Sequence, residues 1–352
     1  MEPGPVPPLD THGRPLGVLR LSLTARCNLA CPYCLPDDRD PPGLLNQTQR
    51  LAVVEAAVAL GARRLRLTGG EPLLHQGLEA LIAATAPLRA RGLRDISLTS
   101  NGVLLTAERA RSLRAAGLDR LTLSLDGASG AAVAMMAGLT GGASAGEAVL
   151  RKVLAALDHA RDAGFDPGAG QLKLNAVIQQ GRNEDQLLPL ASLARDLGVE
   201  LRLIEFMDVG NRNGWRPEAV LSATEMVERV NSRWPLNTLG REQHGTASRW
   251  SYRDGGGRLA VVASVSQPFC GDCDRLRITA DGVAYTCLFS APAQGHDLRP
   301  WLRPGVPQEA LREALAGLWR QRGDRWSEER QEAWRQGAPP PVRHAEMAYL
   351  GG

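Results

Sequence analysis

Six cysteines form two groups of three in this chain of 352 residues. The first group consists of Cys27, Cys31 and Cys34, and the second of Cys270, Cys273 and Cys287. In a reducing compartment such groups favour metal binding or catalysis over disulfides. A structural zinc site needs four ligands, and a zinc knuckle with a distant fourth ligand is one interpretation of the first group. Three thiolates can instead hold three irons of a 4Fe–4S cluster and leave the fourth iron open for catalysis.

The elements that must position the first group alternate regularly. Strand patterns are expected at 18–25, 63–72, 95–102, 119–127, 171–181 and 199–210, and helical patterns at 47–62, 77–92, 107–118, 148–164 and 184–198. This alternation indicates βαβ units and an α/β fold with a parallel sheet. Six steps are fewer than the eight of a TIM barrel, which leaves an open barrel or an open sheet. Because crossovers are right-handed, the carboxyl ends of the strands share one face, where we expect the active site.

The alternation stops near residue 211, and a second region follows. Helices are expected at 221–234 and 308–326, and antiparallel strands at 258–265 and 275–289 with a turn at Asp281-Gly282. A segment rich in Gly and Ala, 128–146, is expected to be a mobile connection. The predicted organisation is a flexible lead (1–17), a partial barrel (18–215), a region carrying the second cysteine group (216–336) and a tail (337–352).

Composition narrows the classes of protein. The chain is 43% hydrophobic and 22% charged, as in ordinary globular proteins, and no apolar run approaches the length of a transmembrane helix. A net charge of +3 gives no indication of a nucleic-acid partner. The N-terminal residues lack the apolar core of a signal peptide, so we expect a cytoplasmic protein with no membrane partner.

The first cysteine group resembles the signature of radical S-adenosylmethionine (SAM) enzymes, C-x3-C-x2-C directly after a first strand with an aromatic residue, Tyr33, before the last cysteine. Thr68-Gly69-Gly70-Glu71-Pro72, after the second strand, resembles the GGEP motif of that superfamily. The resemblance implies that a 4Fe–4S cluster on Cys27, Cys31 and Cys34 cleaves SAM to a 5′-deoxyadenosyl radical. It places the SAM contacts at Tyr33, Gly70, Ser124 and Met207.

The second cysteine group lies in FCGDCDRLRITADGVAYTCLF (269–289), which resembles the auxiliary cluster site of the molybdenum cofactor biosynthesis protein A family of GTP 3′,8-cyclases. The resemblance extends to the closing Gly351-Gly352, which would enter the active site. It implies an incomplete (β/α)6 TIM-type barrel, whose open side is covered by a C-terminal α+β region with a second 4Fe–4S cluster on Cys270, Cys273 and Cys287. The GTP contacts that it implies are Arg20, Arg66, Thr99, Lys173, Arg275, Leu276 and Arg277.

Lys173 and the arginines agree with this assignment on chemical grounds. GTP carries about four negative charges, and the planar guanidinium of arginine suits phosphate oxygens. Lys173 is one of only two lysines, and it lies in an otherwise apolar strand, where an unpaired charge is costly. An outward-facing strand residue is the alternative interpretation for Lys173, as a solvated strand face is for the arginines.

The activity implied by the resemblance is conversion of GTP to 3′,8-cyclo-7,8-dihydro-GTP, the first step of molybdenum cofactor biosynthesis. It further implies an electron donor, either flavodoxin- or ferredoxin-like or a chemical reductant, and a downstream cyclic pyranopterin monophosphate synthase; a homodimer is compatible with it. Two rival functions remain. One is a radical SAM peptide-modifying maturase with an auxiliary cluster, and the other is a non-enzymatic iron–sulfur electron carrier.

Overall fold

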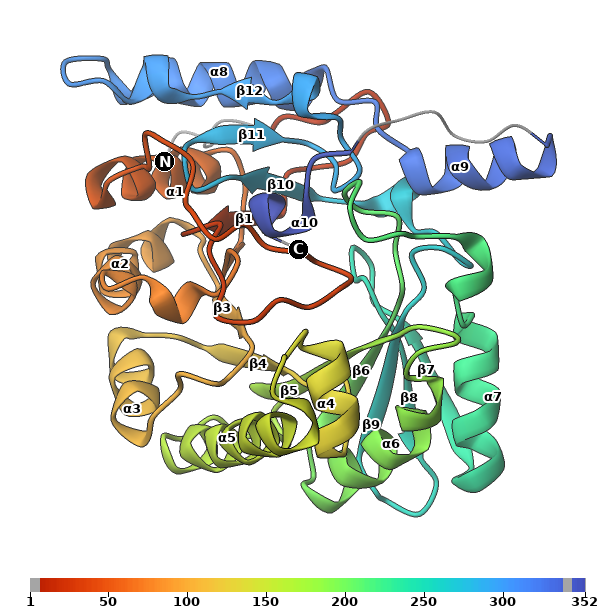
Figure 1. Cartoon of the computed structure of the whole chain (residues 1–352). Coiled ribbons are helices and arrows are strands. Elements are labelled where there is room, and N and C mark those ends of the chain that lie inside the picture. The colour runs from red at the N-terminus through yellow and green to blue at the C-terminus, as the bar shows by residue number, and fades with distance from the viewer. Residues whose placement is uncertain (1–6, 338–343, 352) are drawn as a thin grey trace.

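A single curved sheet of twelve strands organises the computed structural model, which describes residues 7–337 and 344–351 (Figure 1). The strands are β1 Val18–Ser22, β2 Arg64–Thr68, β3 Asp95–Ser100, β4 Arg120–Ser124, β5 Leu172–Ile178, β6 Glu200–Glu205, β7 Leu236–Arg241, β8 Ser248–Tyr252, β9 Arg258–Val262, β10 Arg275–Ile278, β11 Val283–Tyr285 and β12 His296–Asp297. Their order is β12-β11-β10-β1-β2-β3-β4-β5-β6-β9-β8-β7. The sheet is not closed, so the incomplete barrel is confirmed.

Most of the helices lie around the outside of this sheet, and the last one lies near the middle of the view in Figure 1. They are α1 Gln47–Ala59, α2 Leu78–Ala84, α3 Ala107–Ala116, α4 Gly130–Met136, α5 Gly142–Asp162, α6 Leu187–Asp196, α7 Ala223–Arg233, α8 Gln308–Arg320, α9 Trp326–Arg335 and α10 Met347–Leu350. Within the described part of the chain, no helix is both long and apolar enough to cross a membrane.

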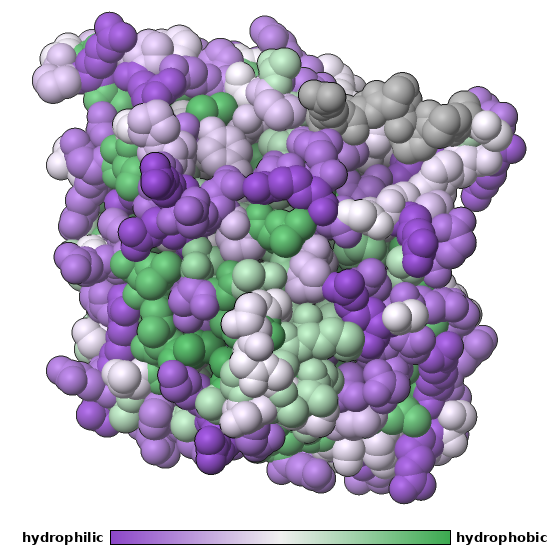
Figure 2. Space-filling model, viewed as in Figure 1, coloured by the Kyte–Doolittle hydropathy of each residue, from purple (hydrophilic) through white to green (hydrophobic). Residues whose placement is uncertain are grey.

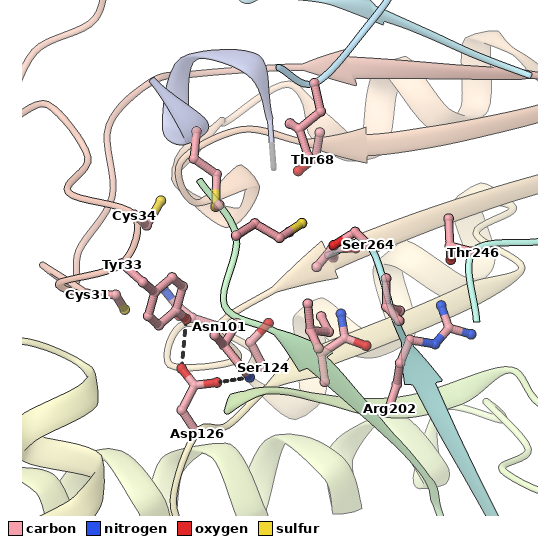
Figure 3. Close-up of a pocket in the computed structure, with 18 of the residues that line it drawn as sticks. Cys31, Tyr33, Cys34, Thr68, Asn101, Ser124, Asp126, Arg202, Thr246 and Ser264 are labelled. Atoms are coloured by element: carbon pink, nitrogen blue, oxygen red, sulfur yellow. Dashed lines mark hydrogen bonds between the residues drawn. The ribbon is translucent and has the colours of Figure 1, made fainter. Parts of the chain in front are cut away.

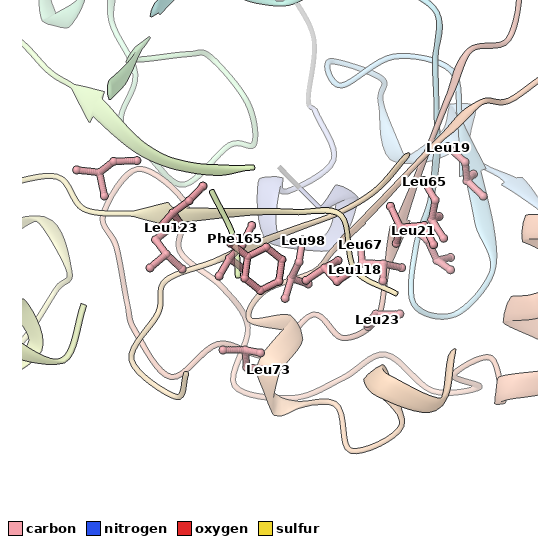
Figure 4. Packing of buried hydrophobic residues seen from close by; sticks show 14 of the residues in the cluster. Leu19, Leu21, Leu23, Leu65, Leu67, Leu73, Leu98, Leu118, Leu123 and Phe165 are labelled. Atoms are coloured by element: carbon pink, nitrogen blue, oxygen red, sulfur yellow. The ribbon is translucent and has the colours of Figure 1, made fainter. Parts of the chain in front are cut away.

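The parallel strands separate apolar from polar residues by simple alternation. Leu19 and Leu21 of β1 align with Leu65 and Leu67 of β2, and these leucines belong to the main hydrophobic core (Figure 4). Arg20, between the two leucines of β1, lines the cavity described below. The leucine face therefore packs against the helices, while the opposite face supplies polar side chains to the barrel interior.

The second region extends the same sheet at both edges. Strand β10 pairs in parallel with β1 and forms an antiparallel hairpin with β11, as the turn at Asp281-Gly282 predicts. Strand β9 instead pairs in parallel with β6 at the other edge, so the expected antiparallel arrangement of 258–265 with 275–289 is wrong. Strands β7 and β8, and helix α9, were not predicted from the sequence. The expected helix 308–326 ends at Arg320.

Segment 128–146 is largely helical rather than a loop, which corrects the sequence-based expectation. It contains α4 and the first residues of α5. A Cβ atom on Gly130 would lie 2.5 Å from the carbonyl oxygen of Ala143, and one on Gly146 would overlap the carbonyl oxygen of Gly130. The glycines therefore allow two helices to pack closely, so a composition that suggested mobility instead forms a helix interface.

The described part of the N-terminal lead, residues 7–17, is also built into the fold. Gly17 and Val18 both donate backbone hydrogen bonds to Asp274, at 3.0 Å each, and Thr11 donates one to Arg322 at 3.1 Å. The expectation of a flexible lead is wrong for these residues, because their backbone groups find partners more than 200 residues away.

Candidate active site

All six cysteines line one cavity at the carboxyl ends of the barrel strands. Figure 3 shows Cys31, Tyr33 and Cys34 at one side of this cavity and Arg202 and Thr246 at the other. Hydrophilic residues dominate the rim of the face seen in Figure 2, and apolar residues gather nearer its middle. The fold thus brings together two cysteine groups that are far apart in the sequence.

The loop after β2 is pressed against the first cysteine loop. Gly70 and Glu71 donate backbone hydrogen bonds to Thr24 and Arg26 at 2.7 and 2.8 Å. A Cβ atom on Gly70 would overlap the carbonyl oxygen of Arg26. Glycine is therefore required at this position for the two loops to approach each other.

Glu71 ties this loop to the next strand. Its buried carboxylate accepts hydrogen bonds from Ser100 Oγ and the backbone N–H of Asn101, both at 2.8 Å, and from the N–H of Leu73 at 2.9 Å. Asn101 in turn directs its side-chain amide toward Cys27 Sγ at 3.6 Å. Glu71 thus positions the cavity wall beside the first cysteine.

Tyr33 is fixed by a carboxylate on the opposite wall. Its hydroxyl donates to Asp126 Oδ2 at 2.7 Å, and the N–H of Val177 donates to Asp126 Oδ1 at 2.7 Å (Figure 3). Burial raises the pKa of Asp126 to about 6, although both hydrogen bonds act to lower it. The aromatic ring is therefore held at one orientation in the cavity.

The first three cysteines are suited to bind metal as thiolates. Burial raises the pKa of Cys27, raises that of Cys31 well above its ordinary value, and raises that of Cys34 to about 12. Thiols with a raised pKa stay protonated at neutral pH, and binding of a metal would displace their protons. Among the described residues, no three His, Cys, Asp or Glu side chains are arranged to hold a single metal ion. A cluster makes a different demand, because each of its thiolates binds a separate iron.

Within the second cysteine group, Cys273 has a more positive environment than the first three cysteines. Although burial acts to raise it, the pKa of Cys273 is lowered, because Arg275 and Arg322 favour the thiolate. Arg275 donates to Cys273 Sγ at 3.2 Å. Burial raises the pKa of Cys287 to about 12. This donor set also fits an iron–sulfur cluster.

Five arginines face the same cavity, namely Arg20, Arg66, Arg202, Arg275 and Arg277. Within the described residues, only Arg202 of the five has a carboxylate partner, Glu200, at 3.3 Å. Burial, with crowding by the other arginines, lowers the pKa of Arg66 to about 9 and that of Arg277 to about 10. One terminal nitrogen of Arg277 is buried without a hydrogen-bond partner in the described structure. Cations held together without counter-charges are suited to bind a polyanion.

Of the other residues predicted for the site, Thr99, Ser124, Met207, Tyr33 and Gly70 line the cavity. Lys173 and Leu276 are not among the residues that line it. Leu276 is 1% exposed in the main core, on the face of β10 opposite to Arg275 and Arg277. Lys173 is buried and donates to Glu200 at 2.8 Å, so its charge is paired. This pair supplies a structural reason for a lysine within an apolar strand.

The end of the chain enters the barrel. Arg20 donates to the carbonyl oxygen of Gly351 from Nη2 at 2.6 Å and from Nε at 3.2 Å. Gly351 has φ 68°, and a Cβ atom there would lie 2.5 Å from Thr68 Cγ2, so glycine suits both the backbone and the space. Gly352 lies outside the described residues.

Several cavity residues were missed from the sequence. Arg202, Asp126 and Met347 all line the site. Arg202 alternates with leucines in the pattern of an ordinary strand, and Met347 lies in the tail, more than 300 residues from the first cysteine group. Asp126 lies in the SLDG segment (124–127), directly after β4, and this position at a strand end is the one feature of the sequence that points to the site.

An open parallel barrel with three cysteines after its first strand defines a radical SAM protein, and residues 21–194 match the model of the Radical SAM superfamily. Residues 199–328 match the model described as Molybdenum Cofactor Synthesis C. A curated relative named GTP 3′,8-cyclase, from Parasynechococcus marenigrum (strain WH8102), is 60% identical over 98% of both chains. Another of that name, from Xanthomonas axonopodis pv. citri (strain 306), is 45% identical over 98% of this chain and 99% of its own. The chain belongs to the GTP 3′,8-cyclase family.

A solved structure with the same fold is Streptococcus suis SuiB bound to precursor peptide SuiA. It matches 95% of this chain and 76% of its own with a TM-score of 0.61 and 14% sequence identity. At this identity the similarity shows the fold alone. Membership of the radical SAM superfamily means that the chain uses SAM and a 4Fe–4S cluster.

Proposed function

We propose that this chain is a GTP 3′,8-cyclase that converts GTP to 3′,8-cyclo-7,8-dihydro-GTP, the first step of molybdenum cofactor biosynthesis. The observation that carries the proposal is the meeting of two three-cysteine groups and five arginines in one cavity. A peptide-modifying maturase has no need for an arginine set without counter-charges. An electron carrier has no need for a substrate cavity.

The first cysteine group holds the cluster that works with SAM. When bound, this cluster and SAM would supply a 5′-deoxyadenosyl radical that takes the 3′-hydrogen of GTP as 5′-deoxyadenosine. Bond formation between C3′ and C8 of guanine then requires one further electron, from the external donor, and one proton to give the dihydro product. Tyr33, Gly70, Ser124 and Met207 hold SAM, with the Tyr33 ring fixed by Asp126. Close approach of the two reacting molecules is a large catalytic contribution in itself.

The arginines hold the triphosphate. Arg20, Arg66, Arg275 and Arg277 have no carboxylate partner among the described residues, so phosphate oxygens relieve their mutual repulsion. Arg202 joins them, since it lines the same cavity. Thr99 holds Arg66 Nε at 3.2 Å and so positions its guanidinium. Lys173 and Leu276 support the arginines indirectly. Lys173 pairs with Glu200, which also pairs with Arg202, and Leu276 packs in the main core beneath Arg275 and Arg277.

The second cysteine group, Cys270, Cys273 and Cys287, would hold a second 4Fe–4S cluster, which would supply a binding site for guanine. Arg20 anchors Gly351, so the tail restricts the space around the reacting ribose. Because primary radicals attack any nearby group, exclusion of water and stray partners protects the reaction.

We further propose a cytoplasmic enzyme that receives electrons from a flavodoxin- or ferredoxin-like donor and passes its product to cyclic pyranopterin monophosphate synthase. We retain 18–215 and 216–336 as functional regions, one for SAM and one for the second cluster, although they share one sheet.

Iron analysis and anaerobic turnover test the proposal. Reconstituted protein should contain about eight irons per chain, and Cys270→Ser should contain about four. EPR of the reduced protein should show two cluster signals, of which GTP perturbs one. Zinc without iron, or iron without any effect of GTP, would favour the rival functions.

A further inference from the structure

A buried charge network contacts the backbone of the second cysteine group, at Cys270 and Cys273. It consists of Asp10 and Arg14 from the N-terminal segment and Arg322 from the loop after α8. Their side chains are 0%, 2% and 1% exposed. Asp10 Oδ2 joins the two guanidinium groups, at 2.6 Å from Arg14 Nε and 3.2 Å from Arg322 Nη1. Charges this deeply buried require a specific reason, because desolvation opposes their burial.

The two arginines donate to the main chain of the cysteines themselves. Arg14 Nη1 lies 2.7 Å from the carbonyl oxygen of Cys270, and Arg322 Nη1 lies 2.6 Å from that of Cys273. The same Cys270 oxygen accepts the N–H of Cys273 at 3.2 Å, which closes the turn between the two cysteines. Each end of the turn is therefore held by its own buried guanidinium.

The surrounding backbone makes this arrangement rigid. Asp10 Oδ1 accepts the N–H groups of His12 and Arg14, both at 2.9 Å, so the segment folds around its own carboxylate. Thr11 Oγ1 donates to the carbonyl oxygen of Arg322 at 2.7 Å, which ties the segment to the loop after α8. Trp319 Nε1 donates to the carbonyl oxygen of Arg14 at 3.0 Å. The network thus joins the N-terminal segment to α8 and the loop after it, next to the second cysteine group.

We propose that Arg14 and Arg322, held by Asp10, are positioning residues that fix the Cys270–Cys273 turn and set the reduction potential of the second cluster. The inference rests on the proposed function, because it requires a cluster at that site. Two guanidinium groups close to the cysteine backbone favour the more negative, reduced state of the cluster and so raise its potential. The Asp10 carboxylate between them has the opposite effect, as has the Asp324 carboxylate, which lies 3.5 Å from Arg322 Nε.

Two kinds of substitution test the proposal, one that removes a positive charge and one that removes a negative charge. Arg322→Met and Arg14→Met should shift the second cluster to a more negative potential, and Asp10→Asn, of nearly identical shape, should shift it to a more positive one. Arg14→Lys, which retains the charge, should shift it less than Arg14→Met. Arg320→Met removes an exposed arginine of α8 and is the matched control, with no shift expected.

The measurement is an anaerobic redox titration of the reconstituted full-length protein followed by EPR, with the first cluster as an internal reference. Shifts of the second signal alone, in opposite directions for Arg322→Met and Asp10→Asn, support the proposal. If a methionine variant loses the second cluster, Asp10→Asn still decides the sign. Equal potentials in all variants, or shifts of the same sign, would overturn it. Wild-type protein with only about four irons per chain would instead overturn the proposed second cluster.

Discussion

Replacing Arg66 by Met removes one guanidinium from the cavity wall and keeps a side chain of similar length. Nε of Arg66 donates to Thr99 Oγ1 at 3.2 Å, its only side-chain hydrogen bond to a described residue, so its terminal nitrogens are available to phosphate. A hydrogen bond to a charged group contributes about 1.5–3 kcal/mol. We therefore expect the Kd for GTP to rise about 10- to 150-fold.

The same substitution should leave the fold intact. Burial lowers the pKa of Arg66 to about 9, and Arg202, Arg120 and Arg277 add to this effect. At pH 7 the side chain is charged in both the folded and the unfolded chain, and a folded-state pKa below the unfolded value means that this charge opposes folding. The thermal midpoint of the ligand-free variant should therefore be unchanged or higher.

Anaerobic calorimetry with cluster-loaded protein and GTP, GDP and guanosine would test the reasoning for Arg66. The loss of affinity should be large for GTP, smaller for GDP and close to nothing for guanosine, which has no phosphate. Arg63→Met, an exposed neighbour at the start of β2, is the control and should bind all three ligands as the wild type does. An equal loss for GTP and guanosine would refute a phosphate contact, as would an unchanged Kd for GTP.

Other substitutions address separate features of the account. Gly70→Ala should force the loop after β2 and the first cysteine loop apart by about 1 Å and slow SAM cleavage by about 100-fold. Gly317→Ala has open space around its Cβ position and should stabilise the protein by about 0.5–1 kcal/mol in unfolding assays. Leu276→Ala should cost about 2–5 kcal/mol of stability and leave the Kd for GTP unchanged in the folded protein; a selective loss of GTP binding would contradict its place in the core. Burial, the largest cause, lowers the pKa of Lys173 to about 8, so its charge opposes folding below that pH and ceases to do so as the pH rises further. Melting curves should therefore show wild type gaining stability relative to Lys173→Met from pH 8 to 10, and a constant difference would show that the pair with Glu200 keeps the lysine charged throughout.

The residues that could be identified from the sequence are those whose chemistry is local. Cysteine spacing marks both groups of cysteines that line the cavity. The leucine alternation of β1 and β2 predicts strands, because the pattern and the strand have the same period. The sequence Arg275-Leu276-Arg277 also indicates which of its side chains face the cavity. Strand alternation places Arg275 and Arg277 on one face and Leu276 on the other, where the structure has it in the core.

The remaining features depend on contacts between distant segments. The register of β5 against β6 aligns Lys173 with Glu200, and no local pattern reveals that pairing. The close packing of α4 on α5 uses glycines that alone suggest a loop. The contact of Arg14 with the Cys270 carbonyl joins residues 256 positions apart. Such contacts form only when distant segments come together in the fold, so the local preferences of residues for helix or strand do not reveal them.

The most direct test of the account is anaerobic turnover of the reconstituted protein with SAM, a reductant and GTP carrying deuterium at C3′. We expect 3′,8-cyclo-7,8-dihydro-GTP as the product and transfer of the deuterium to 5′-deoxyadenosine. Cleavage of SAM with unlabelled 5′-deoxyadenosine and unchanged GTP would contradict it.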